Sequence, residues 1–219
     1  MSLAFARRLP VAALAAGIVA GIGVLPGVAS TAAPPNLLKN GNAERGPAVA
    51  DAASVVEEIP GWTRTGNFTV VKYDAPGGFP EAAVSTKIAG GNSFFAGGPA
   101  NPNSGASQTV SVASRATAID AGKFSATLAG YLGGYSSQRD SLTVTATFLD
   151  ASGKKLGVLK IGPVTPAQRA SETTMIKKSA TGRVPAKTRS IKVALIAVRT
   201  DGSYNDGYAE NLKLTLARA

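Results

Sequence analysis

Alternation of apolar and polar side chains constrains the fold of this chain more than any other pattern. Between residues 142 and 148 every second residue is apolar, and threonines stand between them. The segments 124–128 and 212–216 show the same period of two, which is typical of strands with one face on a core. The segment 189–199 is apolar on both faces beyond Lys192, as expected for a central strand. These patterns predict β-strands.

Shorter apolar runs extend the strand prediction to most of the chain. They fall at 67–73, 82–89, 92–96, 106–112, 155–161 and 172–180. Gly and Pro, 25 and 13 of the 219 residues, separate these runs together with Asn and Asp, and no stretch has a convincing helical period. We therefore expect an all-β fold, an antiparallel β-sandwich.

The first 33 residues differ in composition from the rest. Two arginines near the start precede a long apolar run, small residues follow it, and no residue of the segment is acidic. This order is typical of a secretory signal peptide. A transmembrane anchor is the weaker alternative, because Gly and Pro26 interrupt the run and no basic flank follows it. We expect residues 1–33 to be a signal peptide and residues 34–219 to form one secreted, extracellular domain without a membrane span.

If successive strands run antiparallel, their loops alternate between the two ends of the sandwich. One end then collects the long loops 73–80, 97–105, 133–140, 162–169 and 201–208. Their aromatic rings suit stacking on sugars, and their amide, carboxylate and guanidinium groups suit hydroxyls. The candidate ligand-binding residues are Tyr73, Phe79, Tyr135, Gln138, Arg139, Tyr204, Asn205, Asp206 and Tyr208. The alternative for each tyrosine is that it packs its own loop onto the sandwich.

The loops at the other end are short, basic and free of aromatic residues. Their cationic side chains are Lys154, Lys155, Arg183, Lys187 and Arg189. They could contact anionic cell-wall polymers, or they could form a solvated surface that keeps the protein soluble.

Histidine and cysteine are both absent. Their absence excludes a Ser-His-Asp triad, a cysteine nucleophile, a disulfide and the usual zinc sites. The formal net charge of +10 suggests nucleic acid at first. However, residues 34–149 hold eight basic and eight acidic residues, whereas residues 150–219 hold thirteen and five. Because the excess is local and separate from the aromatic loops, we expect no nucleic-acid partner.

Several segments carry a family resemblance. They are NLLKNGNAERG (36–46), IPGWT (59–63), TATFLDASGKKLG (145–157), GRVPAKTRSIKVALIAV (182–198) and DGYAENLKLTL (206–216). Together they resemble the secreted jelly-roll carbohydrate-binding modules of the galactose-binding-like superfamily. The resemblance implies a jelly-roll sandwich, glycan binding and a core position for Trp62.

The same resemblance implies a structural calcium ion. In those modules an acidic residue at the opening and one on the closing strand form a metal-binding pair, and the matching positions here are Glu44 and Glu210. Oxygen ligands of this kind suit a hard cation. Either glutamate could instead pair with Lys or Arg. No other cofactor is expected.

Three functions follow from these observations. The main interpretation is a secreted, non-catalytic domain that recognises a polysaccharide or cell-surface glycan through the aromatic loops or an adjacent sheet face. A cell-wall-associated interaction protein that uses its basic end is the first alternative. A polysaccharide-degrading enzyme is the second, because Asp140, Asp201 and Asp206 could supply a carboxylate pair, and Tyr135 with Arg139 could serve a lyase.

Overall fold

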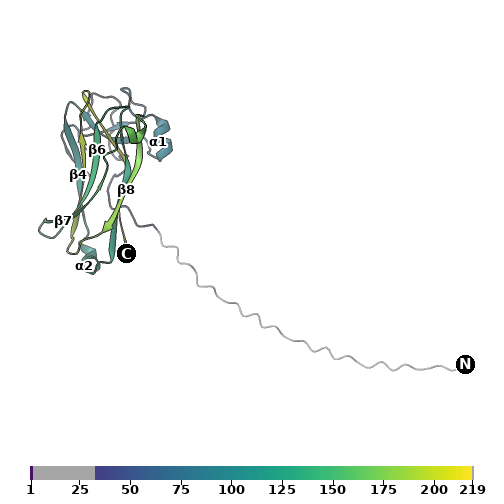
Figure 1. Cartoon of the computed structure of the whole chain (residues 1–219), viewed down its shortest axis with the longest axis vertical. Coiled ribbons are helices and arrows are strands. Elements are labelled where there is room, and N and C mark those ends of the chain that lie inside the picture. The colour runs from purple at the N-terminus through teal and green to yellow at the C-terminus, as the bar shows by residue number, and fades with distance from the viewer. Residues whose placement is uncertain (2–32, 219) are drawn as a thin grey trace. The chain divides into compact units, whose positions relative to one another are not determined.

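Figure 1 shows the computed structural model, which describes Met1 and residues 33–218. The chain divides into two units, Met1–Ala33 and Pro34–Ala219. The predicted signal peptide falls largely on residues 2–32, which lie outside the described residues. Among the residues that are described, no helix is long and apolar enough to cross a membrane.

Two five-stranded sheets form the second unit. Sheet 1 has the order β1-β4-β9-β6-β7, with bounds Thr63–Thr65, Asn103–Ser111, Ser190–Val198, Ser141–Leu149 and Lys155–Ile161. Sheet 2 has the order β2-β3-β10-β5-β8, with bounds Thr69–Lys72, Ser93–Pro99, Tyr204–Arg218, Phe124–Gly134 and Thr174–Arg183. All neighbouring strands named here pair antiparallel. The predicted antiparallel β-sandwich is therefore confirmed.

The main core lies between the two sheets. The alternating apolar residues of β6 are buried there, and Leu128 of β5 and Leu214 of β10 face them from sheet 2. Trp62 packs its ring edge-on against Phe95, with 5.6 Å between ring centroids, and its indole N–H donates to the Asn40 carbonyl at 3.1 Å. The core position expected for Trp62 is confirmed.

The segment 82–89, predicted as a strand, forms the helix α1 (Ala82–Ile88) instead. Val84 and Ile88 stand one helical turn apart, and both pack against apolar side chains. Ala89 adopts a left-handed conformation that ends the helix, and the Gly90 N–H donates to the Ser85 carbonyl at 2.9 Å. A second helix, α2 (Ala116–Asp120), and two short 3₁₀ turns, η1 (Ala113–Arg115) and η2 (Ala167–Arg169), complete the elements.

Because α1 is a helix, residues 73–92 form a single connection between β2 and β3. This connection packs against the outer face of sheet 2, which is the face turned away from sheet 1, and builds a second apolar cluster there. Within the cluster, Phe94 lies edge-on to Tyr208 at 5.2 Å, and Phe79 lies 6.2 Å from the same ring. Part of the outer face is thus covered by a layer that the sequence did not predict.

Candidate functional site

Hydrogen bonds link four of the five loops that the sequence predicted for one end of the sandwich. The buried carboxylate of Asp140 accepts hydrogen bonds from the backbone N–H groups of Thr200, Asp201 and Asp206 at 2.6, 2.9 and 2.9 Å. The Ala100 N–H donates to the Ser203 carbonyl at 3.1 Å, which ties the loop after β3 to the same group. Asp140 is therefore a structural clip between loops, and its carboxylate is not available for chemistry.

Arg169 fastens the loop before β8 to the loop after β5. Its side chain is buried, and its guanidinium donates to the carbonyls of Tyr135 at 3.0 Å, Gln138 at 2.7 Å, Glu172 at 2.6 Å and also Ser136. Burial lowers the pKa of Arg169 from its ordinary value, and the charges of Tyr208 and Asp206 oppose that shift. The arginine holds Tyr135 in place through its backbone.

Most of the predicted ligand-binding residues lie beneath the surface. Tyr73, Phe79, Asn205, Asp206 and Tyr208 are buried. The Tyr208 hydroxyl donates to the Asp206 carboxylate, and burial raises the pKa of Asp206 to about 6. Tyr73 and Tyr208 belong to the apolar cluster between the 73–92 connection and sheet 2, which is the structural role that the sequence had left open for the tyrosines.

The remaining predicted residues are nearer the surface. Tyr204 is half-buried and lies 5.1 Å from Phe79, and burial raises the pKa of its hydroxyl. Gln138 is half-buried with its side-chain oxygen lacking a donor, whereas Arg139 is exposed. Neither Gln138 nor Arg139 lines a groove with Tyr135. Of the nine predicted residues, Phe79 and Tyr135 line the groove described next.

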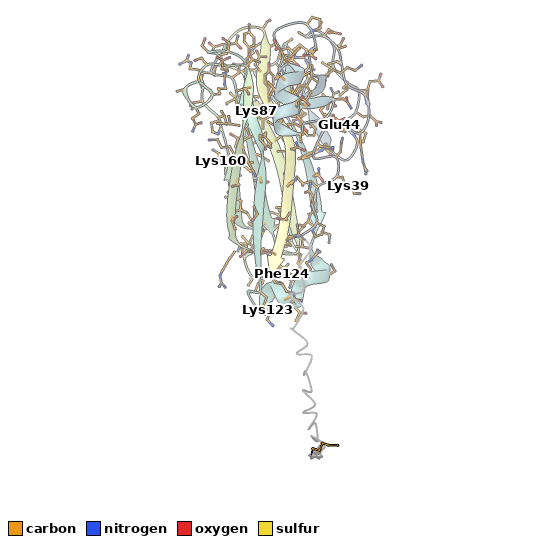
Figure 2. All side chains as sticks on the ribbon, turned by 90° about the vertical axis from the view of Figure 1, so that its right-hand side faces the viewer. Lys39, Glu44, Lys87, Lys123, Phe124 and Lys160 are labelled. Carbon is orange, nitrogen blue, oxygen red and sulfur yellow. The ribbon has the colours of Figure 1, made fainter. Side chains whose placement is uncertain are left out.

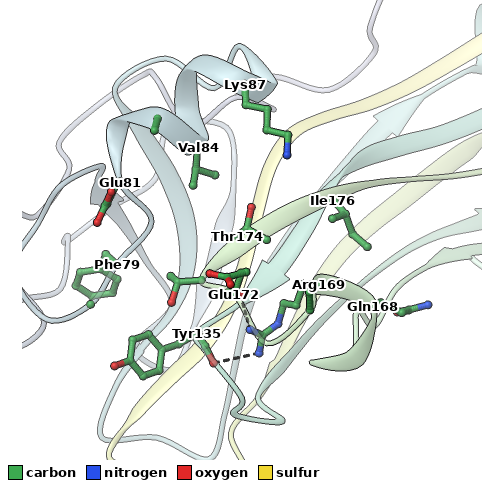
Figure 3. A pocket seen from close by; sticks show the side chains of 14 residues that line it. Phe79, Glu81, Val84, Lys87, Tyr135, Gln168, Arg169, Glu172, Thr174 and Ile176 are labelled. Atoms are coloured by element: carbon green, nitrogen blue, oxygen red, sulfur yellow. Dashed lines mark hydrogen bonds between the residues drawn. The ribbon is translucent and has the colours of Figure 1, made fainter.

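An open groove of about 750 Å³ lies between α1 and the segment that leads into β8 (Figure 3). We call it the α1 groove; its lining includes Phe79, Glu81, Val84, Lys87, Tyr135, Gln168, Glu172 and Thr174. Tyr135 is half-buried at one wall of the groove. Gly78, which has a φ of +84°, allows this ring to lie close, because a Cβ at that position would overlap it. The groove thus combines one fixed aromatic ring with exposed polar and charged side chains.

Several groove residues were not anticipated from the sequence. They include Glu81, Lys87, Gln168, Arg169 and Glu172. The helical spacing of Val84 and Ile88, followed by Ala-Gly-Gly, is a signal that indicates α1 and with it Lys87. No comparable signal distinguishes buried Arg169 from an exposed loop arginine.

Glu44 and Glu210, the predicted metal pair, lie near each other. Glu210 is fully buried, and neither of its carboxylate oxygens accepts a hydrogen bond. Burial raises the pKa of Glu210 to about 10, with the Asn211 N–H opposing the shift and the nearby charge of Glu44 adding to it. The Tyr73 hydroxyl is also buried without a partner, and its pKa is raised by burial and then by both glutamates.

Glu44 is better satisfied than Glu210. Its carboxylate accepts from the backbone N–H groups of Asn92 and Ser93 at 2.8 and 2.9 Å and from the Ser93 hydroxyl at 3.0 Å. Within the described part of the chain, no third acidic residue joins the pair. Two buried carboxylate oxygens without donors, beside a second carboxylate, fit an oxygen-ligated cation.

The basic residues at the other end of the sandwich are partly engaged. Arg189 forms an ion pair with Asp120 at 2.8 Å, and this contact lowers the pKa of Asp120 to about 2. Arg183 donates to the Gly122 carbonyl at 3.4 Å. Other lysines of the basic half lie along strands rather than at this end; they are Lys160, Lys177, Lys192 and Lys213. The positive charge is therefore less concentrated at the end than the loop pattern suggested.

Comparison with known proteins finds no matching family model and no matching curated protein. Similar solved structures include Family 16 carbohydrate-binding module-2 (19% identity, 82% of this chain and 99% of that chain, TM-score 0.49). Another is TmCBM61 in complex with beta-1,4-galactotriose (17% identity, 84% and 99%, TM-score 0.47). The enzymatically active domain of bacteriophage CBA120 tailspike protein 4 is also similar (16% identity, 83% of this chain, TM-score 0.48), and this chain spans 21% of its length. The ligand has to be inferred from the groove itself.

Proposed function

We propose that this protein is a carbohydrate-binding domain that holds a glycan in the α1 groove. The observation that supports this most is the half-buried Tyr135, which is held in place in a groove of about 750 Å³ among polar side chains. An aromatic ring gives a sugar apolar contact area, while Lys87, Gln168 and Glu172 offer donors and acceptors for its hydroxyls. Because Arg169 and Gly78 hold the Tyr135 ring in place before a ligand binds, this side chain loses little conformational entropy on binding.

We further propose that the domain binds its glycan without cleaving it. A glycoside hydrolase needs two carboxylates, one of which keeps its proton near neutral pH through burial. The Asp140 carboxylate already accepts hydrogen bonds from three backbone N–H groups. The Asp206 carboxylate is buried and accepts a hydrogen bond from the Tyr208 hydroxyl. Glu81 and Glu172 line the α1 groove but are exposed to solvent. Exposed carboxylates of this kind suit hydroxyl recognition better than proton transfer.

Retention on immobilised neutral polysaccharides, such as galactan, xylan and a mixed-linkage glucan, tests the proposal. We expect the wild-type protein to be retained by at least one polymer, and Tyr135→Ala to weaken retention about tenfold or more. Tyr208→Phe, which changes only a buried hydroxyl, is the control for effects on packing. Unchanged retention of the Tyr135→Ala variant, or no retention of the wild type at millimolar sugar, would contradict a role for the groove.

We also propose that Glu44 and Glu210 hold a structural calcium ion. Such an ion would supply the positive charge that the two buried oxygens of Glu210 lack. It would join the segment before β1 to β10 and stabilise the sandwich beside the 73–92 connection. The buried Tyr73 hydroxyl faces the same pair of charges.

Export to the extracellular space remains our proposal for localisation. It rests on the basic, apolar and small-residue order of residues 1–33. Sequencing the N-terminus of the protein recovered from culture medium checks it, with cleavage near residue 33 as the expected result.

A further inference from the structure

A second hollow lies on the outer face of sheet 2, beside the C-terminal end of α1. It has a volume of about 450 Å³ and is lined by Ile88, Ala89, Ala129, Gly130, Tyr131, Lys177, Asn211 and Lys213. Figure 2 looks onto this face, with α1 and Lys87 above and the strands below it uncovered. We call this place the Tyr131 hollow.

Strand register places two lysines around the ring of Tyr131. Tyr131 of β5 pairs directly with Lys177 of β8, so the two side chains stand side by side on the outer face. Lys213 of β10 pairs with Ala129, which is two residues from Tyr131 on the same face. Tyr131 is half-buried and both lysines are exposed. The hollow thus presents one ring with a cation on either side.

The floor and the rim of the hollow are shaped by small and fixed residues. Ala129 stands two residues before Tyr131 on the same face of β5, and its small side chain leaves space beside the Tyr131 ring. The Asn211 side chain donates to the carbonyls of Ile88 and Ala89 at 3.0 and 2.9 Å, which fastens the end of α1 to β10. A flat ring could therefore stack on Tyr131 without any movement of the surrounding backbone.

The charged side chains that line the Tyr131 hollow are both positive. No carboxylate lines the Tyr131 hollow. Glu210 is the cross-strand partner of Tyr131, but its side chain is buried and does not line the hollow. Within residues 33–218 the ion pair found joins Arg189 and Asp120, so neither Lys177 nor Lys213 is ion-paired there. The α1 groove, in contrast, is lined by both Glu81 and Glu172.

We propose that the Tyr131 hollow binds an acidic polysaccharide, in which rings that stack on Tyr131 carry carboxylates that contact Lys177 and Lys213. We choose an acidic over a neutral polysaccharide because of charge complementarity: the unpaired lysines attract an anionic chain, and the aromatic ring gives its sugars apolar contact. The inference rests on the proposed function in that it takes the protein to be a carbohydrate-binding domain, and it adds a second site for a polymer of another charge class. It places that recognition at a different set of residues.

Polygalacturonate and its carboxyl-reduced form, which has the same backbone without the charge, are the probes. We expect the wild-type protein to bind polygalacturonate at low ionic strength and the reduced polymer about tenfold more weakly. The double variant Lys177→Glu/Lys213→Glu should lose at least as much affinity for polygalacturonate, and Tyr131→Ala should weaken binding as well. Added salt should weaken wild-type binding.

The matched control is Lys160→Glu/Lys192→Glu, which reverses two exposed lysines on the outer face of sheet 1. It changes the net charge equally and should leave the affinity nearly unchanged. Equal binding of both polymers, or an equal loss in the control, would overturn the proposal. Tyr135→Ala distinguishes the two sites. If it loses binding of the neutral glycan and still binds polygalacturonate, the α1 groove and the Tyr131 hollow act independently, so one proposal can fail without the other.

Discussion

At the residue scale, Glu210 is a fully buried carboxylate whose oxygens accept no hydrogen bond. Its folded-state pKa of about 10 lies above the ordinary value of 4.5. Between these two pH values the folded protein holds more protons than the unfolded chain, so the free energy of unfolding falls as the pH rises. A bound cation would remove this penalty by stabilising the ionised carboxylate.

We therefore predict that calcium raises the melting temperature of the wild-type protein and does so more strongly toward the alkaline side of this window. Glu210→Gln should melt at a higher temperature than the wild type in chelator and should not respond to calcium. The exposed Glu57→Gln provides the comparison. Thermal unfolding with and without calcium decides the matter, and identical wild-type melts in both would contradict the calcium site.

Gly78 is the second residue whose environment makes a sharp prediction. A Cβ here would overlap the Tyr135 ring, whereas a Cβ on Gly77 would approach only Ala52 and Phe79. Both glycines have positive φ, at +84° and +117°, so alanine costs backbone energy at either position. Gly78→Ala should weaken glycan binding several-fold more than Gly77→Ala at similar melting temperatures, measured by titration. Equal binding by the two variants would show that the ring position is unimportant.

At the scale of elements, Arg169 joins two loops through four backbone carbonyls. Removing the guanidinium leaves these buried acceptors without donors. We predict that Arg169→Met lowers the free energy of unfolding by about 2–4 kcal/mol, measured by urea denaturation. Arg199→Met, which removes one hydrogen bond of 2.7 Å to the exposed Ser203 carbonyl, should cost less than about 1 kcal/mol. Similar losses of unfolding free energy in the two variants would show that Arg169 does not hold the two loops together.

The same scale shows which parts of the fold could be predicted. The period of two in β6 and in the C-terminal part of β10 predicted buried and exposed faces correctly, because one face of each strand meets the main core. The strand prediction for the segment 82–89 was wrong, because a short apolar pattern fits a strand and a helix equally well. Only its packing partners on sheet 2 distinguish the two structures. That error concealed the layer that buries Tyr73 and Tyr208, and with it the groove.

At the scale of the whole molecule, the two outer faces of the sandwich differ. Exposed positions of sheet 1 include Val158, Lys192 and Ile196 on strands whose outward residues are otherwise mostly Thr, Ser and Ala. The outer face of sheet 2 carries α1, the α1 groove and the Tyr131 hollow. The loop end that was predicted from the sequence supplies Tyr135, and the groove that we propose for binding lies on the adjacent sheet face, the other location that the sequence interpretation named.

Backbone chemical-shift mapping with a neutral oligosaccharide from a retained polymer tests the central claim most directly. The account predicts saturable shifts that cluster on residues of the α1 groove, around Tyr135, Lys87 and Glu172, and that vanish in Tyr135→Ala. Shifts that cluster on the outer face of sheet 1, or that persist unchanged in Tyr135→Ala, would contradict it.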